Sequence, residues 1–118
     1  MATTVERRSR VGRYRGAMTT LVISGEIVID PDDFDAALAI VEPLVAATQQ
    51  EAGCLAYDFW VDPRDRGRFR VFEEWESVEA NAAHSESAHL AAFYTAITAI
   101  HVRSAELSRF VVSSKSPL

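Results

Sequence analysis

The sequence predicts a single domain of the α+β class, with one antiparallel sheet and two helical layers on one of its faces. The chain has 118 residues, which is the size of one ordinary domain. Its apolar residues alternate with period two in some segments and recur at steps of three and four residues in others. These segments follow the order strand, helix, strand, strand, helix, strand, without an internal repeat. This is the ferredoxin-like βαββαβ order, with a four-stranded antiparallel sheet.

The first strand is expected over residues 21–29, LVISGEIVI, because its apolar residues fall on one side at every second position. A helix should follow, since Asp30 can cap it and Pro31 suits the first helical position. Its core-facing stripe consists of Phe34, Ala37, Leu38, Val41, Leu44, Val45 and Thr48. Pro43 should kink or break this helix, because proline lacks the backbone donor and crowds the preceding turn.

The second half of the pattern begins after Gly53, which ends the helical region. CLAYDFWVD and RFRVFEEWE are expected as two hairpin strands around the turn DPRDRG. Ser77 can cap a second helix, and a break near residues 85–87 should lead to a further helical segment that carries His89. A last strand, less regular in pattern, is expected over about residues 102–112.

The sheet face turned away from the helices is predicted to be rich in apolar residues. By strand parity this face carries three acids, Glu26, Asp58 and Glu74. It also carries six apolar residues, namely Val22, Val28, Cys54, Ala56, Trp60 and Phe72. Because so large an apolar face is normally covered, the pattern predicts a homodimer that pairs sheet to sheet.

Charge is distributed unevenly along the chain. Residues 1–17 hold five arginines and one acid, so they carry +4 of a net charge of −5 and leave about −9 for residues 18–118. An acidic body repels phosphate backbones, which argues against nucleic acid as a partner. We expect residues 1–17 to be a flexible extension of a domain spanning residues 18–118. The alternative is an arm that packs against a partner subunit.

The composition also constrains the location of the protein. No apolar run approaches the roughly 20 residues of a membrane span, so a soluble protein without membrane contact is expected. The single cysteine, Cys54, excludes an internal disulfide. It fits a reducing compartment, and the expected localisation is cytoplasmic.

Three ionisable side chains are candidates for chemistry. Glu73 lies by parity on the face that meets the helices, where an unpaired carboxylate would be costly and would have a raised pKa. It either pairs with a nearby donor or orients a histidine. His84 and His89 are five residues apart, about 140° around a continuous helix. A break between them could direct both to a common cavity, where either could accept or donate a proton; otherwise they are ordinary helix residues.

Aromatic side chains are expected near the histidines. Pockets are mostly apolar with a few polar groups, so these aromatics are either pocket walls or plain core. They are Tyr57, Phe59, Trp75 and Phe93. Neither an HExxH motif nor a thiolate cluster is present, so no metal site is expected. Neither GxGxxG nor a P-loop occurs, so no organic cofactor is expected.

The stretch EAGCLAYDFWVDPRDRGRFRVFEEWESVEANAAHSESAHLAAF has a glycine-led strand, an E-x-W strand end and a histidine pair. It resembles the antibiotic biosynthesis monooxygenase (ABM) domain, particularly its quinol monooxygenase-like branch. The resemblance covers residues 21–112 and is densest over residues 73–93. It implies a homodimeric α+β barrel, with a pocket between sheet and helices in each subunit. It also implies oxidation of quinols or polycyclic phenols by O₂ without metal or flavin.

The resemblance implies roles for the candidate residues. His84 or His89 would be the base and Glu73 an orienting group, and the walls would be Trp75, Tyr57, Phe59 and Phe93. Two branches of the family fit poorly. The polyketide-oxidising branch uses tyrosine, asparagine, tryptophan and tyrosine, where this chain has Phe59, Val71, Trp75 and Asn81. The haem-degrading branch needs an asparagine on the first strand, and the only asparagine here is Asn81.

The sequence therefore leads to a cofactor-independent monooxygenase that oxidises quinol-like or polycyclic aromatic small molecules with O₂. One alternative is an isomerase of small carbonyl compounds, which shifts a proton without oxygen. Another is a non-catalytic ligand-binding or dimerisation module.

Overall fold

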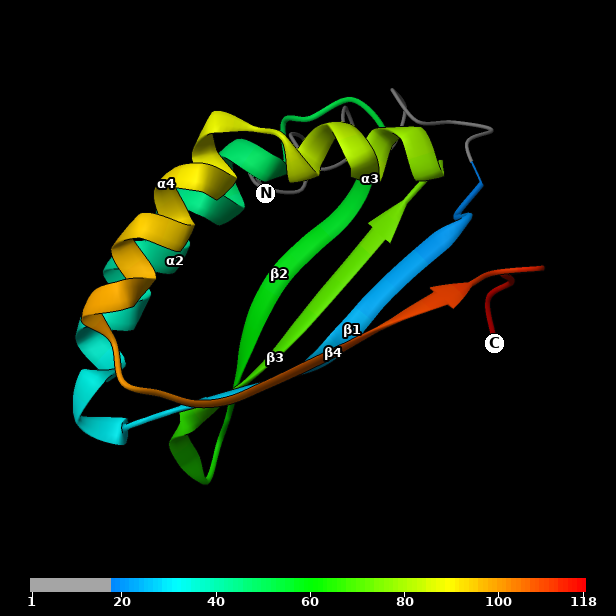
Figure 1. The fold of residues 1–118 in the computed structure, drawn as a ribbon. Coiled ribbons are helices and arrows are strands. Elements are labelled where there is room, and N and C mark those ends of the chain that lie inside the picture. Colours follow the sequence, from blue (N-terminus) through cyan, green and yellow to red (C-terminus); the bar gives the residue numbers. More distant parts are fainter. Residues whose placement is uncertain (1–17) are drawn as a thin grey trace, which may run out of the picture.

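A computed structural model describes residues 18–118 of the chain (Figure 1). The predicted extension, residues 1–17, lies outside the described residues. The elements are β1 (Leu21–Ile29), η1 (Pro31–Asp33), α2 (Phe34–Thr48), β2 (Cys54–Asp62), β3 (Asp65–Trp75), α3 (Val78–Ser85), α4 (Ala88–Ala96), η2 (Ile97–Ala99) and β4 (Val102–Val111). This confirms the predicted ferredoxin-like α+β order.

The four strands form one antiparallel sheet in the order β2-β3-β1-β4. The helices lie on one face of this sheet, with α2 and α4 side by side (Figure 1). β1 is central, and Gly25 pairs with Val71 of β3 on one side and with Leu107 of β4 on the other. β4 is the edge strand next to β1, and all of its residues are exposed.

The helical region after β1 differs from the prediction at both of its prolines, Pro31 in η1 and Pro43 in α2. Asp30 caps the short helix η1, where its Oδ1 accepts a hydrogen bond of 3.0 Å from the backbone N–H of Asp32. α2 then begins at Phe34 and continues through Pro43, so the expectation of a break is wrong. Pro43 and Ala39, one turn before it, are both exposed. Water can therefore replace the hydrogen bond that the proline removes.

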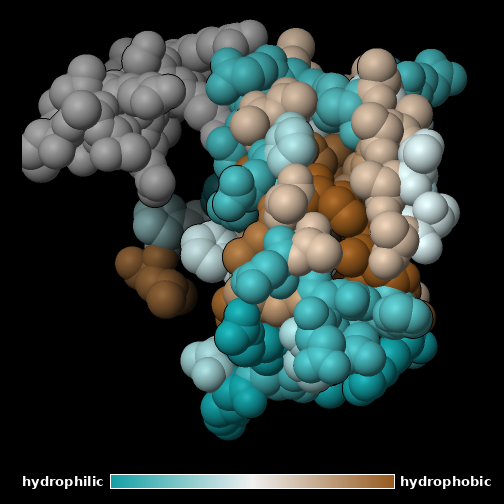
Figure 2. Space-filling model, turned by 90° about the vertical axis from the view of Figure 1, so that its left-hand side faces the viewer, coloured by the Kyte–Doolittle hydropathy of each residue, from teal (hydrophilic) through white to brown (hydrophobic). Residues whose placement is uncertain are grey.

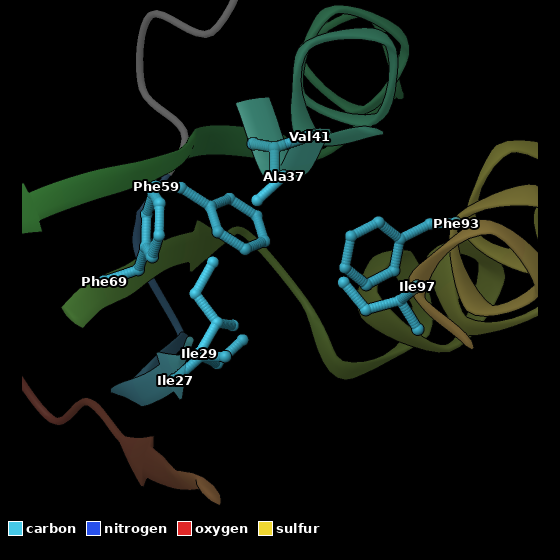
Figure 3. Close-up of a pocket in the computed structure, with 8 residues that line it drawn as sticks. All are labelled: Ile27, Ile29, Ala37, Val41, Phe59, Phe69, Phe93 and Ile97. Atoms are coloured by element: carbon cyan, nitrogen blue, oxygen red, sulfur yellow. The ribbon is translucent and has the colours of Figure 1, made fainter. Parts of the chain in front are cut away.

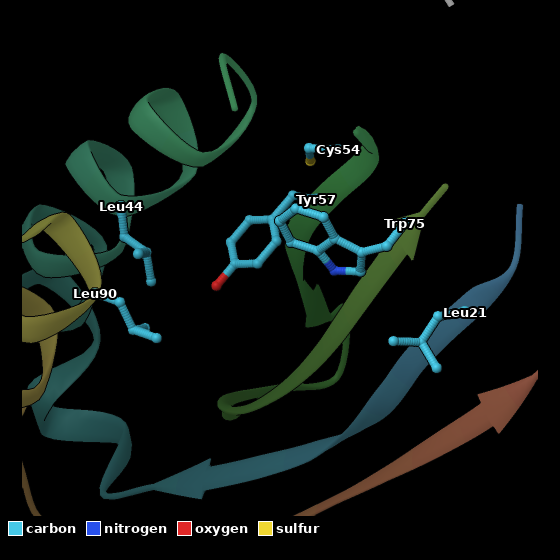
Figure 4. Close-up of a cluster of buried hydrophobic side chains, with 6 residues drawn as sticks. All are labelled: Leu21, Leu44, Cys54, Tyr57, Trp75 and Leu90. Atoms are coloured by element: carbon cyan, nitrogen blue, oxygen red, sulfur yellow. The ribbon is translucent and has the colours of Figure 1, made fainter. Parts of the chain in front are cut away.

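The core between sheet and helices consists of two clusters. One, shown in Figure 4, contains Leu21, Leu44, Cys54, Tyr57, Trp75 and Leu90. The other contains Ile29, Ala37, Phe69 and Ile100. The assignment of Cys54 to the open sheet face is wrong, because the register of β2 against β3 shifts between Cys54 and Ala56. Such a bulge turns the side chain before it to the opposite face, so Cys54 is buried opposite Trp75.

The predicted break between the last two helices is confirmed. Ser77 caps α3 by accepting a hydrogen bond of 3.0 Å from the Ala80 N–H. Ser87 caps α4 by accepting one of 3.3 Å from the Leu90 N–H. The chain therefore changes direction between Ser85 and Ala88, which places His84 at the end of one helix and His89 at the start of the next. Among residues 18–118, no helix has the length and apolar character needed to cross a membrane.

Candidate functional site

Both histidines of the α3–α4 junction contact one carboxylate oxygen. Oε2 of Glu51 lies 2.6 Å from Nδ1 of His84 and 2.7 Å from Nε2 of His89. A carboxylate oxygen accepts, so both ring nitrogens are the N–H donors. In a neutral imidazole of His84, this hydrogen bond at Nδ1 leaves Nε2 as the acceptor. The break between the helices thus brings the two imidazoles together, with their centroids 6.0 Å apart.

Glu51 lies in the turn between α2 and β2 and is not among the candidate residues predicted from the sequence. The turn is held by hydrogen bonds from the Glu51 N–H to the Thr48 carbonyl and from the Cys54 N–H to the Glu51 carbonyl. Gly53 has a φ of 82°, which a side chain would strain. Glu51 contacts His84 across 33 residues, a separation that no local pattern reveals. The available signal was an acid just before a glycine turn that leads into a core strand.

Two aromatic side chains hold His84 in place. The His84 ring centroid lies 5.2 Å from that of Tyr57 and 5.0 Å from that of Trp75. Both aromatics are buried in the core cluster of Figure 4, where their rings lie next to each other. Burial raises the pKa of the Tyr57 phenol, so this hydroxyl stays protonated. The imidazole of His84 is thus packed in one orientation against apolar surface.

Glu73 is buried beside the indole of Trp75, and its Oε1 accepts a hydrogen bond of 2.9 Å from Trp75 Nε1. Burial raises the pKa of Glu73. The Trp75 hydrogen bond and the nearby His84 act in the opposite direction, while the charge of Glu51 raises it further. Glu73 therefore orients Trp75, and the carboxylate in contact with the imidazoles is Glu51.

We expect Glu73→Gln to change how the free energy of unfolding depends on pH. A carboxyl with a raised folded-state pKa holds its proton more tightly in the folded chain than in the unfolded chain. Stability therefore falls as the pH rises from the ordinary value of 4.5 through the raised pKa. Glutamine still accepts the Trp75 N–H but cannot ionise. In urea denaturation over a pH series, the free energy of unfolding of the variant should increase relative to that of the wild type as the pH rises.

The adjacent acid on the other face of β3 provides a control of opposite sign. Burial acts to raise the pKa of Glu74, but hydrogen bonds from Thr19 and Lys115 outweigh it and lower the pKa. That stabilisation is present at neutral pH and is lost as the pH falls through the lowered pKa. The free energy of unfolding of Glu74→Gln should therefore decrease relative to that of the wild type as the pH rises. If both variants showed the same pH trend, the raised pKa of Glu73 and the lowered pKa of Glu74 would both be contradicted.

An apolar hollow lies between the sheet and the helices (Figure 3). It is lined by Ile27, Ile29, Ala37, Val41, Phe59, Phe69, Phe93 and Ile97. Its volume is ≈ 20 Å³, room for about one water molecule. Phe59 and Phe93, two of the predicted wall residues, line it with their centroids 6.1 Å apart. Phe59 is also 6.2 Å from Tyr57, so these rings connect the hollow to the site at His84.

The helical side of the molecule also has apolar surface. Viewed toward α2 and α4, apolar side chains gather in the middle of this face, and hydrophilic ones lie below them (Figure 2).

The site at the α3–α4 junction also contains possible metal ligands. The side chains of Glu51, His84 and His89 could together hold a metal ion. No metal site was predicted from the sequence, because it has neither an HExxH motif nor a thiolate cluster.

The chain is similar to known proteins in both sequence and structure. The family model described as antibiotic biosynthesis monooxygenase matches residues 20–96. Protein PA3566 of Pseudomonas aeruginosa has a similar solved structure, with a TM-score of 0.74 and 26% identity over 83% of this chain and 98% of that chain. A solved structure described as an antibiotic biosynthesis monooxygenase has a TM-score of 0.69 and 31% identity over 81% of this chain and 99% of that chain. The uncharacterised protein sll1783 of Synechocystis is 23% identical over 104 residues, which are 88% of this chain and 71% of that protein. The chain therefore belongs to the antibiotic biosynthesis monooxygenase family.

Proposed function

We propose that the protein is a cofactor-independent monooxygenase that oxidises quinol-like or polycyclic aromatic small molecules with O₂. One observation carries this proposal: the imidazole of His84 is backed by the Glu51 carboxylate and packed against Tyr57 and Trp75. A carboxylate that holds the Nδ1–H of a histidine fixes the tautomer in which Nε2 is basic. The site then offers a base in dry, aromatic surroundings.

The proposed chemistry draws its electrons from the substrate. Nε2 of His84 removes a proton from a quinol hydroxyl, and the electron-rich anion reduces O₂. One oxygen atom enters the ring and the other leaves as water, so that a hydroquinone becomes a hydroxyquinone. The protein needs only to hold a base, orient the anion and exclude water.

The hollow of Figure 3 is where we propose that the aromatic part of the substrate binds. At ≈ 20 Å³ it is too small for a ring, so Phe59 and Phe93 have to move aside. Both are only partly buried, which leaves them room to change rotamer. Their movement would join the hollow to the face of His84.

The test is oxygen uptake by chelator-treated, flavin-free protein with a hydroquinone. Under ¹⁸O₂ the product should be a hydroxyquinone with one labelled ring oxygen, formed without hydrogen peroxide. Hydrogen peroxide together with unlabelled quinone would instead indicate simple autoxidation. Uptake no faster than in buffer would contradict the proposal. Product formed under anaerobic conditions would favour the isomerase.

A second candidate is a non-catalytic ligand-binding or dimerisation module. The small volume of the hollow and the complete burial of Trp75 favour it. Saturable binding of an aromatic ligand without turnover would support this candidate over the oxygenase.

We also propose that two chains pair through their sheets. The exposed fractions of Trp60 and Phe110 are 61% and 52%, large for aromatic residues. Both belong to the face opposite the helices, since Phe110 pairs with Val22 and Trp60 with Arg70 across the sheet. Burying this face in a homodimer would remove the aromatics from water.

We expect Phe110→Glu to raise the dissociation constant of this dimer at least about tenfold, because buried aromatics dominate interface energies. The new carboxylate would also add to the acids Glu26 and Glu106 on the same face of the sheet. Sedimentation velocity over a concentration series checks the shift. Val78→Glu is the control, because it replaces an exposed apolar residue at the start of α3, where an acid is tolerated. A wild type that is monomeric throughout, or equal dissociation in both variants, would contradict the prediction.

A further inference from the structure

The two imidazoles and the carboxylate at the α3–α4 junction also form the donor set of a metal centre. Glu51, His84 and His89 each offer one ligand atom, and these atoms lie within 4.8 Å of one another. Two imidazole nitrogens and one carboxylate oxygen hold zinc in sites with an open position, and non-haem iron(II). We propose that Glu51, His84 and His89 bind one divalent first-row transition-metal ion. This site goes beyond the proposed oxygenation, which needs no metal.

The geometry requires only small movements of side chains. Ligand atoms about 2.1 Å from a tetrahedral ion are roughly 3.4 Å apart. The Glu51 oxygen lies 2.6 Å and 2.7 Å from the two nitrogens, so it has to retreat by less than about 1 Å. Glu51 carries a long side chain on a turn, and it can make this adjustment through its rotamer. His84 can stay as it is, between Tyr57 and Trp75.

The burial and charge of the site suit a cation that arrives from solvent. The exposed fractions of the side chains are 5% for His84, 16% for Glu51 and 27% for His89. The ion can therefore enter past His89, while His84 anchors the inner side. One carboxylate and two neutral imidazoles leave a single positive charge on a bound divalent ion, which a water or an anionic ligand at the open position can moderate.

The ion and the present hydrogen bonds exclude each other. A metal at Nδ1 of His84 and Nε2 of His89 takes the place of the two protons that now point at Glu51. In a neutral imidazole the displaced proton moves to the other ring nitrogen, so binding of the ion should change the tautomer of both rings. It would also leave Nε2 of His84 protonated, so the metal-bound form lacks the proposed base.

The third histidine of the chain provides a matched control. Nδ1 of His101 lies 2.9 Å from Oδ2 of Asp33, which is also an imidazole–carboxylate contact. His101 is exposed and has no second imidazole beside this carboxylate, since the chain has only three histidines and the other two meet at Glu51. A single such pair should not hold an ion as three convergent ligands do.

The experiment titrates chelator-treated, tag-free protein with Zn²⁺ by calorimetry and with Co²⁺ by visible absorption. The wild type should bind one equivalent, and the Co²⁺ spectrum should be that of a four- or five-coordinate ion. Glu51→Gln and His89→Ala should each weaken the affinity at least tenfold, and His101→Ala should leave it unchanged. Circular dichroism confirms that each variant is folded. If Glu51→Gln does not fold, His89→Ala at the solvent edge decides alone.

The inference is overturned if the wild type binds less than one equivalent. It is equally overturned if the His89→Ala and His101→Ala variants bind with the same affinity. Both readouts are taken without substrate, so the metal site and the metal-free oxygenation can fail independently.

Discussion

His84→Ala should lower kcat for the oxygen-dependent oxidation of a hydroquinone by about 10²–10⁴-fold, the usual contribution of a positioned general base. Nε2 of His84 is the ring acceptor that its hydrogen bond to Glu51 leaves available. His89→Ala should have a smaller effect, because His89 stands at the solvent edge and supports the same carboxylate. Initial rates of oxygen uptake and of product formation measure both variants.

The controls separate catalysis from folding. His101→Ala removes an exposed imidazole away from the site and should leave the rate unchanged. His84→Ala removes a buried side chain, so part of its rate should return when free imidazole is added to fill the space. His84→Gln keeps more of the volume but supplies no base, and it should be as slow as the alanine variant. Full activity in a His84→Ala, His89→Ala double variant would refute the proposed mechanism.

Trp75→Ala should lower the free energy of unfolding by about 3–5 kcal/mol, the usual cost of truncating a buried aromatic residue. Trp75 is fully buried in the centre of the core cluster in Figure 4. Its loss also leaves the Glu73 carboxylate without the N–H that it accepts. Domains of this kind have only about 5–15 kcal/mol of stability, so the variant is expected near the limit of folding. Urea denaturation measures the change.

A matched tryptophan and a conservative variant test this reasoning. Trp60→Ala removes an exposed indole from the other face of the same sheet. In the Phe110→Glu background, where dimerisation does not contribute, it should change stability by less than about 0.5 kcal/mol. Trp75→Phe keeps much of the volume but loses the N–H, so we expect a loss of about 1–3 kcal/mol. Similar losses of unfolding free energy for Trp75→Ala and Trp60→Ala would contradict the burial of Trp75 in this core.

Much of the fold could be read from the sequence, because one buried face imposes a period. The alternation from Leu21 to Ile29 gave the first strand at its observed bounds. Ser77 predicted the helix start and Ser87 lies in the predicted break, and both caps are local hydrogen bonds. Cys54 was misplaced because a bulge changes strand parity without altering the pattern of residue types.

The candidate site was predictable only in part. The histidine pair and its aromatic neighbours follow from local spacing and strand parity, and they lie together in the structure. The carboxylate partner does not follow from them. Strand parity pointed to Glu73, because it places this acid on the buried face of the sheet. Oε1 of Glu73, however, accepts the Trp75 N–H. Glu51 reaches the imidazoles only because the α2–β2 turn packs against the α3–α4 junction, which is a tertiary contact.

The central position of β1 affects how this chain can fold during synthesis. Of the strands in residues 18–118, β1 is the first to leave the ribosome, yet its neighbours in the sheet are β3 and β4, which are translated later. Such non-local pairing makes folding slow, because a long loop has to close before the contacts form. Until β4 is translated, one edge of β1 remains open to strands of other nascent chains. β4 therefore has to pair with β1 before both edges of this strand are covered.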